Sequence, residues 1–112
     1  MNYYAVLYEV VDDFVSRRAP FREQHLGLVG EANQRGELLL AGALAEPADR
    51  ALLIFHAPDR SVVEDFVRRD PYVTNGLVTH WEIRPWANVI NYDPSGAGHI
   101  VTAPAGFRGN QD

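Results

Sequence analysis

A histidine and an aspartate, His25 and Asp70, are the residues in this sequence best suited to catalysis. An imidazole gains or loses a proton near neutral pH. A carboxylate bonded to one ring nitrogen fixes the tautomer and leaves the other nitrogen free to move a proton. If the two side chains meet, they form a dyad for general acid–base catalysis. Arg22 lies one helical turn before His25, where its guanidinium could hold a carboxylate or phenolate of a substrate.

Two further residues are weaker candidates for contact with a substrate. Tyr72 could donate a hydrogen bond to a substrate oxygen, and His80 could reach a cleft from the last predicted strand. Each candidate also has a purely structural explanation. A histidine on a helix is often a satisfied structural residue, an aspartate before a proline often only ends a helix, and a tyrosine after a helix end often packs as an anchor. Spacing alone leaves both interpretations open.

The helix that carries His25 is predicted to begin near Ser16 or Pro20 and to end at Arg35. A proline suits the first turn of a helix, where its missing N–H leaves no intrahelical bond unmade. Gly36 follows as a C-terminal cap. Five residues recur at helical spacing and predict one shared face: Phe21, His25, Leu28, Val29 and Ala32.

The second predicted helix positions Asp70. Ser61 and Glu64 have the spacing of a capping box at its start. The helix should end at Asp70, because Pro71 disfavours α geometry in the residue before it. The Asn-Gly pair at 75–76 then predicts a turn.

Four segments are predicted strands: 3–10, 38–44, 51–57 and 77–86. Gly42 inside the second one indicates a bulge or a close backbone approach. The last one alternates, with Leu77, Thr79, Trp81 and Ile83 on one face and Val78, His80, Glu82 and Arg84 on the other.

The resulting order is β-α-β-β-α-β, which predicts an α+β, ferredoxin-like fold. Two helices would cover one face of a four-stranded antiparallel sheet, so His25 and Asp70 would lie on the same side. The other face would be wet, or covered by a ligand or a second subunit.

Composition limits the classes of function. The chain has 112 residues, enough for one domain, which we place at 1–90, followed by a Gly/Pro-rich tail or arm at 91–112. The net charge is −5 and there is no basic run, so nucleic acid is not an expected partner. Cysteine is absent and the four histidines show no H-x-x-x-H spacing, so we expect no metal. No secretory signal or membrane-length apolar run is present, and we expect a soluble cytoplasmic protein with no membrane partner.

The sequence resembles the YciI-like, or YCII-related, family. The resemblance covers Tyr3 to about Ile90. It rests on five segments in the expected order: Arg22-x-x-His25, Leu40-Ala41-Gly42, Asp70-Pro71-Tyr72, Gly76-Leu77-Val78 and Arg84-Pro85-Trp86. This chain departs from the family pattern in a short connection between its second and third strands and in its long tail, so substrate specificity does not carry over.

The resemblance implies a dimeric α+β barrel with a cleft in each subunit and a His–Asp catalytic dyad at His25 and Asp70. One relative eliminates chloride from a chlorinated hydroxyquinol, and muconolactone isomerases share the general fold. We therefore expect a homodimer or higher homo-oligomer and a cofactor-independent lyase or isomerase acting on a small cyclic or phenolic substrate. The alternatives are a non-catalytic ligand-binding or accessory protein and a cofactor-free, monooxygenase-like protein. The enzyme hypothesis requires that the two residues touch and reach a pocket.

Overall fold

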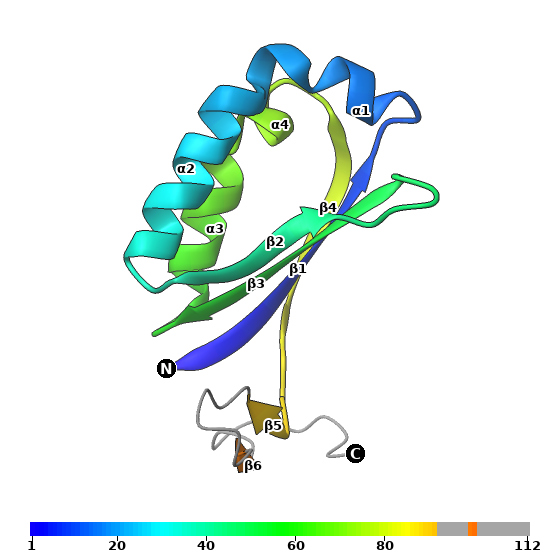
Figure 1. The fold of residues 1–112 in the computed structure, drawn as a ribbon. Helices are drawn as coiled ribbons and strands as arrows, with labels where there is room; N and C mark the ends of the chain where they lie inside the picture. Colours follow the sequence, from blue (N-terminus) through cyan, green and yellow to red (C-terminus); the bar gives the residue numbers. More distant parts are fainter. Residues whose placement is uncertain (92–98, 101–112) are drawn as a thin grey trace.

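The structure is a computed structural model that describes residues 1–91 and, for their backbone, residues 99–100 (Figure 1). Its elements follow the predicted order with some additions. They are β1 (Asn2–Val10), α1 (Phe14–Arg17), the 3₁₀ turn η1 (Ala19–Phe21), α2 (Arg22–Gln34), β2 (Leu38–Ala43), β3 (Arg50–Ala57), α3 (Arg60–Arg69), α4 (Pro71–Thr74), β4 (Val78–Pro85), β5 (Ile90–Asn91) and β6 (His99–Ile100).

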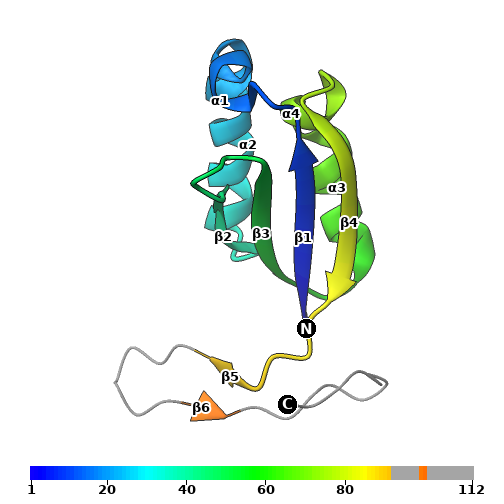
Figure 2. The ribbon, with the colours of Figure 1, turned by 90° about the vertical axis from the view of Figure 1, so that its right-hand side faces the viewer.

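The four main strands form one antiparallel sheet in the order β2-β3-β1-β4. Helices α2 and α3 lie against one face of this sheet, and the views in Figures 1 and 2 agree on this layering. The predicted α+β, ferredoxin-like fold is therefore confirmed. None of the helices in the described part of the chain has the length and apolar character needed to span a bilayer.

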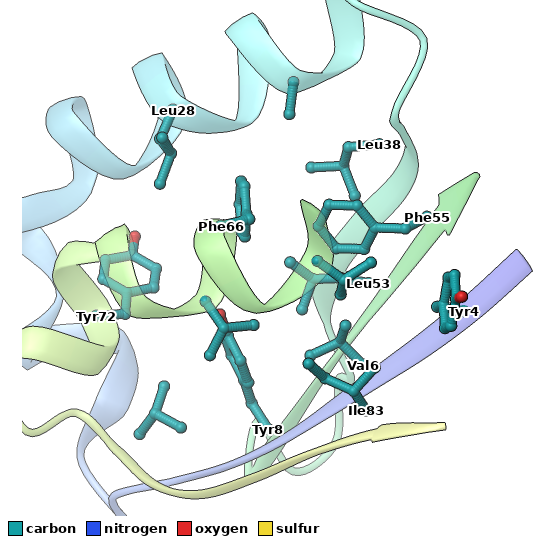
Figure 3. Close-up of a cluster of buried hydrophobic side chains, with 14 of the residues drawn as sticks. Tyr4, Val6, Tyr8, Leu28, Leu38, Leu53, Phe55, Phe66, Tyr72 and Ile83 are labelled. Atoms are coloured by element: carbon teal, nitrogen blue, oxygen red, sulfur yellow. The ribbon is translucent and has the colours of Figure 1, made fainter. Parts of the chain in front are cut away.

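The core lies between the sheet and the two long helices (Figure 3). On β1, Tyr4, Val6 and Tyr8 point toward the helices and are buried, as the period of two in a strand requires. They pack with side chains from every neighbouring element, among them Leu28, Leu53, Phe55, Phe66 and Ile83. This packing holds α2, α3 and β1 in fixed positions, and these elements lead to the candidate site.

The first predicted helix is broken into three parts. Pro20 lies in η1, directly before α2, instead of in the first turn of one continuous helix. A proline has no N–H to donate, so α1 cannot continue through it. Phe14 anchors the short α1 because its ring is buried. Four of the five residues predicted to share one helical face lie on α2 and are buried or partly buried there, and the fifth, Phe21, is partly buried at the end of η1.

Two local predictions need correction at α3 and β4. The side chain of Asp59, not that of Ser61, caps α3, accepting the Ser61 N–H at 2.9 Å. On β4, the pairing with β1 shifts at Glu9 and Val10. Thr79 is therefore exposed instead of facing inward with Trp81, and its hydroxyl donates to the carbonyl of Glu9.

The predicted turn after α3 is correct, and one short helix is added to it. Gly76 has φ +76°, the left-handed conformation expected for the Asn-Gly pair. The four-residue α4 between Asp70 and this turn is too short to show helical periodicity in a sequence. At Gly42 the pairing of β2 with β3 is regular, because the irregularity lies between Leu38 and Leu40.

The outer face of the sheet carries apolar side chains. Leu7 and Leu52 lie opposite each other on β1 and β3, and both are exposed together with Leu40 on β2. Beyond β4, the Trp86 N–H extends the pairing with β1 by donating to the Tyr3 carbonyl at 2.9 Å, and Trp86 and Ile90 line a hollow together with Leu40. The predicted arm beyond residue 91 lies outside the described residues, apart from the pairing of β5 with β6.

Candidate active site

Asp70 occupies a corner between two helices. Its backbone is extended (φ −66°, ψ 119°), as expected before Pro71, so α3 ends there. Its side chain then caps α4 by accepting the Tyr72 N–H at 3.0 Å. The same local geometry turns the carboxylate into the protein, and Asp70 is 0% exposed.

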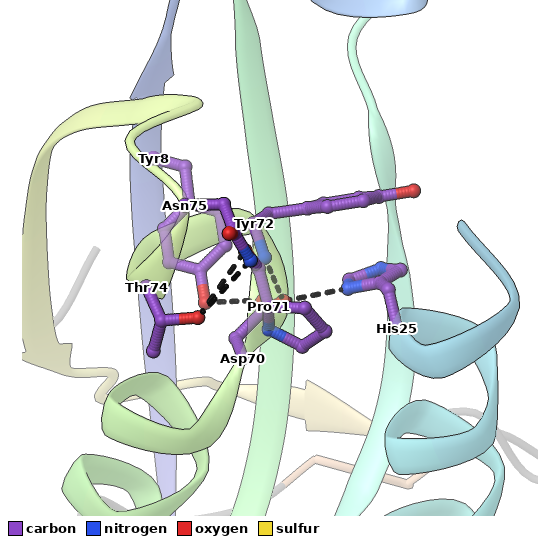
Figure 4. A network of polar contacts seen from close by, with 7 residues as sticks. All are labelled: Tyr8, His25, Asp70, Pro71, Tyr72, Thr74 and Asn75. Carbon is purple, nitrogen blue, oxygen red and sulfur yellow. Dashed lines mark hydrogen bonds and ion pairs between the residues drawn. The ribbon is translucent and has the colours of Figure 1, made fainter. Parts of the chain in front are cut away.

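Three donors from three different elements satisfy this buried carboxylate (Figure 4). Oδ1 accepts from the Tyr72 N–H and is 2.8 Å from His25 Nδ1. Oδ2 accepts from the Tyr8 hydroxyl at 2.8 Å. A buried carboxylate without such partners would be strongly destabilising. The network therefore joins β1, α2 and α4 around one negative charge.

His25 presents one ring nitrogen to Asp70 and leaves the other free. Because the Asp70 oxygens act as acceptors, Nδ1 carries the proton in this hydrogen bond. Nε2 then holds a lone pair, and it forms no hydrogen bond with any residue that the structure describes. The imidazole also stacks on the Tyr72 ring, with centroids 3.8 Å apart and planes 13° apart. The two contacts fix the ring orientation, and the side chain remains 13% exposed.

Tyr8 is a member of this network that the sequence did not reveal. Burial, followed by the negative charge of Asp70, raises the pKa of the Tyr8 hydroxyl well above its ordinary value. Tyr8 therefore remains protonated and acts as a hydrogen-bond donor. Its place on the inward face of β1 follows from strand alternation, but Tyr4 has the same pattern. Only the position of Asp70 at the start of α4, within hydrogen-bond distance of the Tyr8 hydroxyl, distinguishes them.

A cavity of about 130 Å³ opens beside the dyad. His25, Tyr8 and Tyr72 line it together with apolar and small side chains and two arginines. The other lining residues are Phe14, Arg18, Arg22, Leu26, Val29, Ala41, Gly42, Ala43, Ala51 and Leu53. At Gly42, a Cβ would meet nothing within 4 Å, so the glycine leaves open space and makes no close contact. The site thus combines a proton acceptor, aromatic surface and positive charge.

The structure brings together four of the five candidate residues. Arg22 and Tyr72 line the same cavity as His25, and Asp70 lies directly behind the imidazole. The Tyr72 hydroxyl is buried and has no hydrogen-bond partner within the described part of the chain. His80 is not brought to the site, because it pairs with Glu9 and is exposed on the outer face of the sheet.

The remaining histidines also lie away from the cavity. His56 stacks on Tyr3, with ring centroids 4.4 Å apart, on the outer side of β1 and β3. For His99 the structure describes only the backbone. Across residues 1–91, no group of three or more His, Cys, Asp or Glu side chains could hold a metal ion.

Comparison with known proteins identifies the family. The sequence model of the YCII-related domain family matches residues 1–87. The chain belongs to the YCII-related domain family. This confirms the resemblance drawn from the motifs around His25 and Asp70. A search of the curated proteins finds no match.

Two solved structures are similar in fold to this YCII-related protein. One is 5-chloro-2-hydroxyhydroquinone dehydrochlorinase from Burkholderia phenoliruptrix, in complex with 2,5-dihydroxybenzoquinone. It has a TM-score of 0.66 and 16% identity, covering 77% of this chain and 94% of that one. A crystal structure of a protein from Agrobacterium tumefaciens has a TM-score of 0.52 and 14% identity, covering 79% of this chain and 93% of that one.

Proposed function

We propose that this YCII-related protein is a small cofactor-independent enzyme of the lyase or isomerase type. His25 is the general base and acid, and Asp70 is its orienting partner. The observation that carries the proposal is the 2.8 Å contact between His25 Nδ1 and Asp70 Oδ1 at the wall of a cavity. A histidine so oriented, with its second nitrogen unpaired, is the arrangement that general base catalysis requires.

In the proposed reaction, the lone pair on His25 Nε2 takes a proton from a C–H or O–H group of the substrate. The imidazolium that forms keeps its Nδ1–H bonded to Asp70, and the negative charge opposite stabilises it. The electron pair left on the substrate either expels a leaving group, which is an elimination, or accepts the proton from Nε2 at another atom, which is an isomerisation. Tyr8 and the Tyr72 N–H hold the carboxylate in place throughout.

The cavity favours a small cyclic or phenolic substrate. Phe14 and Tyr72 are among its lining residues, and aromatic side chains suit contact with a planar ring. The unpaired Tyr72 hydroxyl would donate to a substrate oxygen, and Arg22 would hold an anionic group. The relative of known structure with 2,5-dihydroxybenzoquinone bound is a dehydrochlorinase, which is consistent with this substrate class.

The direct test is a screen of phenolic and lactone compounds for turnover and for proton exchange with D₂O, followed by NMR. We expect His25→Ala to abolish both activities. His80→Ala is a matched control, because it removes an exposed histidine from the opposite face of the sheet and should leave activity unchanged. Activity that survives His25→Ala would exclude the proposed mechanism. A compound that binds in the cavity of the wild type without exchange or turnover would favour the ligand-binding alternative.

We also propose that the protein is a homodimer that packs two sheets face to face. The supporting observation is the apolar outer surface, where Leu7, Leu40 and Leu52 from three adjacent strands are exposed. Contiguous exposed leucines on a sheet are typical of an interaction surface. A domain of this size has a small core and gains stability by burying more apolar surface in a dimer.

A further inference from the structure

Two arginines at the cavity, Arg18 and Arg22, have no carboxylate partner among the residues that the structure describes. Both line the cavity and flank the turn η1. Five other arginines each lie within 4.0 Å of a carboxylate: Arg17, Arg35, Arg60, Arg69 and Arg84. Arg50 and Arg68 also have no such partner, but they do not line the cavity. Two of the four described arginines without a carboxylate partner therefore line the cavity.

Arg18 is positioned by an aromatic ring. Its Cζ lies 5.4 Å from the centroid of the Phe14 ring, and the side chain is half-buried. A cation–π contact holds the charge over the ring and leaves the guanidinium N–H donors available to a ligand. Arg18 thus differs from the paired surface arginines, whose donors already engage a carboxylate.

A continuous series of ring contacts links Arg18 to the dyad. The Phe14 ring meets the Tyr72 ring edge-on, with centroids 5.3 Å apart at 87°. The Tyr72 ring stacks on His25 at 3.8 Å. Phe14 and Tyr72 are both buried, so their positions are fixed by the core. Two fixed rings therefore lie between the positive charge of Arg18 and the proton acceptor His25.

The hydroxyl of Tyr72 supplies an independent indication of a ligand. It is buried and belongs to a residue that lines the cavity, and it forms no hydrogen bond with any residue that the structure describes. Buried polar groups in proteins nearly always have a partner, so this hydroxyl calls for an oxygen or nitrogen acceptor from outside the chain. An acceptor atom on the bound molecule would provide one.

We propose that Arg18 and Arg22 form an anion subsite, and that the ligand is a single planar ring bearing a carboxylate and an oxygen that accepts from Tyr72. Planar carboxylates match the forked donors of guanidinium groups. Cavities on the order of 150 Å³ admit a benzene ring, so the space of about 130 Å³ has room for no more than one ring, and its carboxylate would extend toward the exposed Arg22. This inference specifies the substrate class of the proposed function and rests on the same cavity.

Binding of the three hydroxybenzoate isomers, measured by calorimetry and NMR, tests the subsite without requiring turnover. The corresponding hydroxybenzamides are neutral probes of the same shape, benzoate lacks the phenolic oxygen, and inorganic phosphate is a tetrahedral anion. We expect at least one hydroxybenzoate to bind about tenfold or more tightly than its amide and than phosphate. Benzoate should bind more weakly than this isomer because it leaves the Tyr72 hydroxyl unpaired.

The variants Arg18→Gln and Arg22→Gln should each remove most of the preference for the acid over the amide. Arg17→Gln is the matched control, since Arg17 is adjacent, exposed and paired with Asp13 at 3.7 Å. It should keep the wild-type preference. Tyr72→Phe should bring the affinity for the hydroxybenzoate down to that for benzoate. Thermal melts establish that each variant is folded.

Any one of four results would overturn the anion subsite. The hydroxybenzoate and its amide could bind equally, phosphate could bind as tightly as the hydroxybenzoate, or Arg17→Gln and Arg18→Gln could lose the preference equally. The fourth result is that no isomer binds to the wild type. The proposed catalytic function can fail while the anion subsite stands. If hydroxybenzoate binding depends on Arg18 and Arg22 but His25→Ala does not affect any activity found, the subsite stands and the catalytic role of His25 fails.

Discussion

Replacing Tyr8 by phenylalanine tests whether the network around Asp70 is a stabilising part of the fold. The substitution removes one hydroxyl, which donates to Asp70 Oδ2 at 2.8 Å. Both residues are almost fully buried, with Tyr8 1% and Asp70 0% exposed, so water cannot replace the lost donor. Hydrogen bonds to charged groups contribute about 1.5–3 kcal/mol. We therefore expect Tyr8→Phe to lower the free energy of unfolding by about that amount and the Tm by about 6–15 °C.

The same substitution should also change the response of stability to alkaline pH. Because the pKa of Tyr8 is raised in the folded protein, the unfolded chain releases this proton first as pH rises above about 10. Stability that is fully present below that pH is then lost at up to about 1.4 kcal/mol per pH unit. The Tyr8→Phe variant lacks this contribution, so the stability difference between wild type and variant should narrow above about pH 10.

Urea unfolding at neutral pH and at a series of alkaline pH values measures both effects. Tyr4→Phe is the matched control, because Tyr4 lies on the same inward face of β1 and its hydroxyl has no bond to Asp70. A Tyr8→Phe variant as stable as Tyr4→Phe, or a stability difference independent of pH up to strongly alkaline conditions, would refute the reasoning.

Four other substitutions have defined outcomes. Asp70→Asn keeps an oxygen opposite His25 Nδ1, because the Tyr72 N–H needs an acceptor there, but it removes the negative charge that stabilises the imidazolium, so any base-catalysed activity should fall by about 100-fold or more, measured as kcat/KM. Gly76→Ala should destabilise the protein by about 1–2 kcal/mol in urea unfolding, because φ at this position is +76°. Gly30→Ala should stabilise it by about 0.5–1 kcal/mol, because Gly30 lies in the middle of α2 and nothing is within 4 Å of the new Cβ. Leu52→Glu places a charge on the outer sheet face and should convert a dimer to a monomer in analytical ultracentrifugation; a wild type that is monomeric at tens of micromolar would contradict the dimer.

The order of the elements could be predicted from the sequence because each has a local signal. Pro71 after Asp70 ends α3, and the Asn-Gly pair at 75–76 forms the turn before β4. The break at Pro20 was missed because a proline in the first turn of a helix and a proline in a 3₁₀ turn before it have the same local sequence.

The residues of the site could be predicted only where a sequence motif marked them. His25 and Asp70 meet as expected, because both helices pack on the same side of the sheet. Tyr8 depends on its hydrogen bond to Asp70, 62 positions away, and no spacing along the chain reveals it. Arg18 lies four residues after Phe14, and this spacing indicates a contact only where a helix is known to cover both positions. His80 lies on the outer face because the register with β1 places it beside Glu9.

The central claim is that Asp70 holds the proton on Nδ1 of His25 and leaves Nε2 as the base. Nitrogen-15 NMR of the imidazole, at a pH where the ring is neutral, measures the tautomer directly, and His25→Ala assigns the signals. We predict a protonated Nδ1 and an unprotonated Nε2 in the wild type, and the same tautomer in Asp70→Asn, whose amide oxygen stays at the Oδ1 position because the Tyr72 N–H needs an acceptor there. A wild-type His25 protonated on Nε2 would contradict the account, because the nitrogen facing the cavity could not accept a proton.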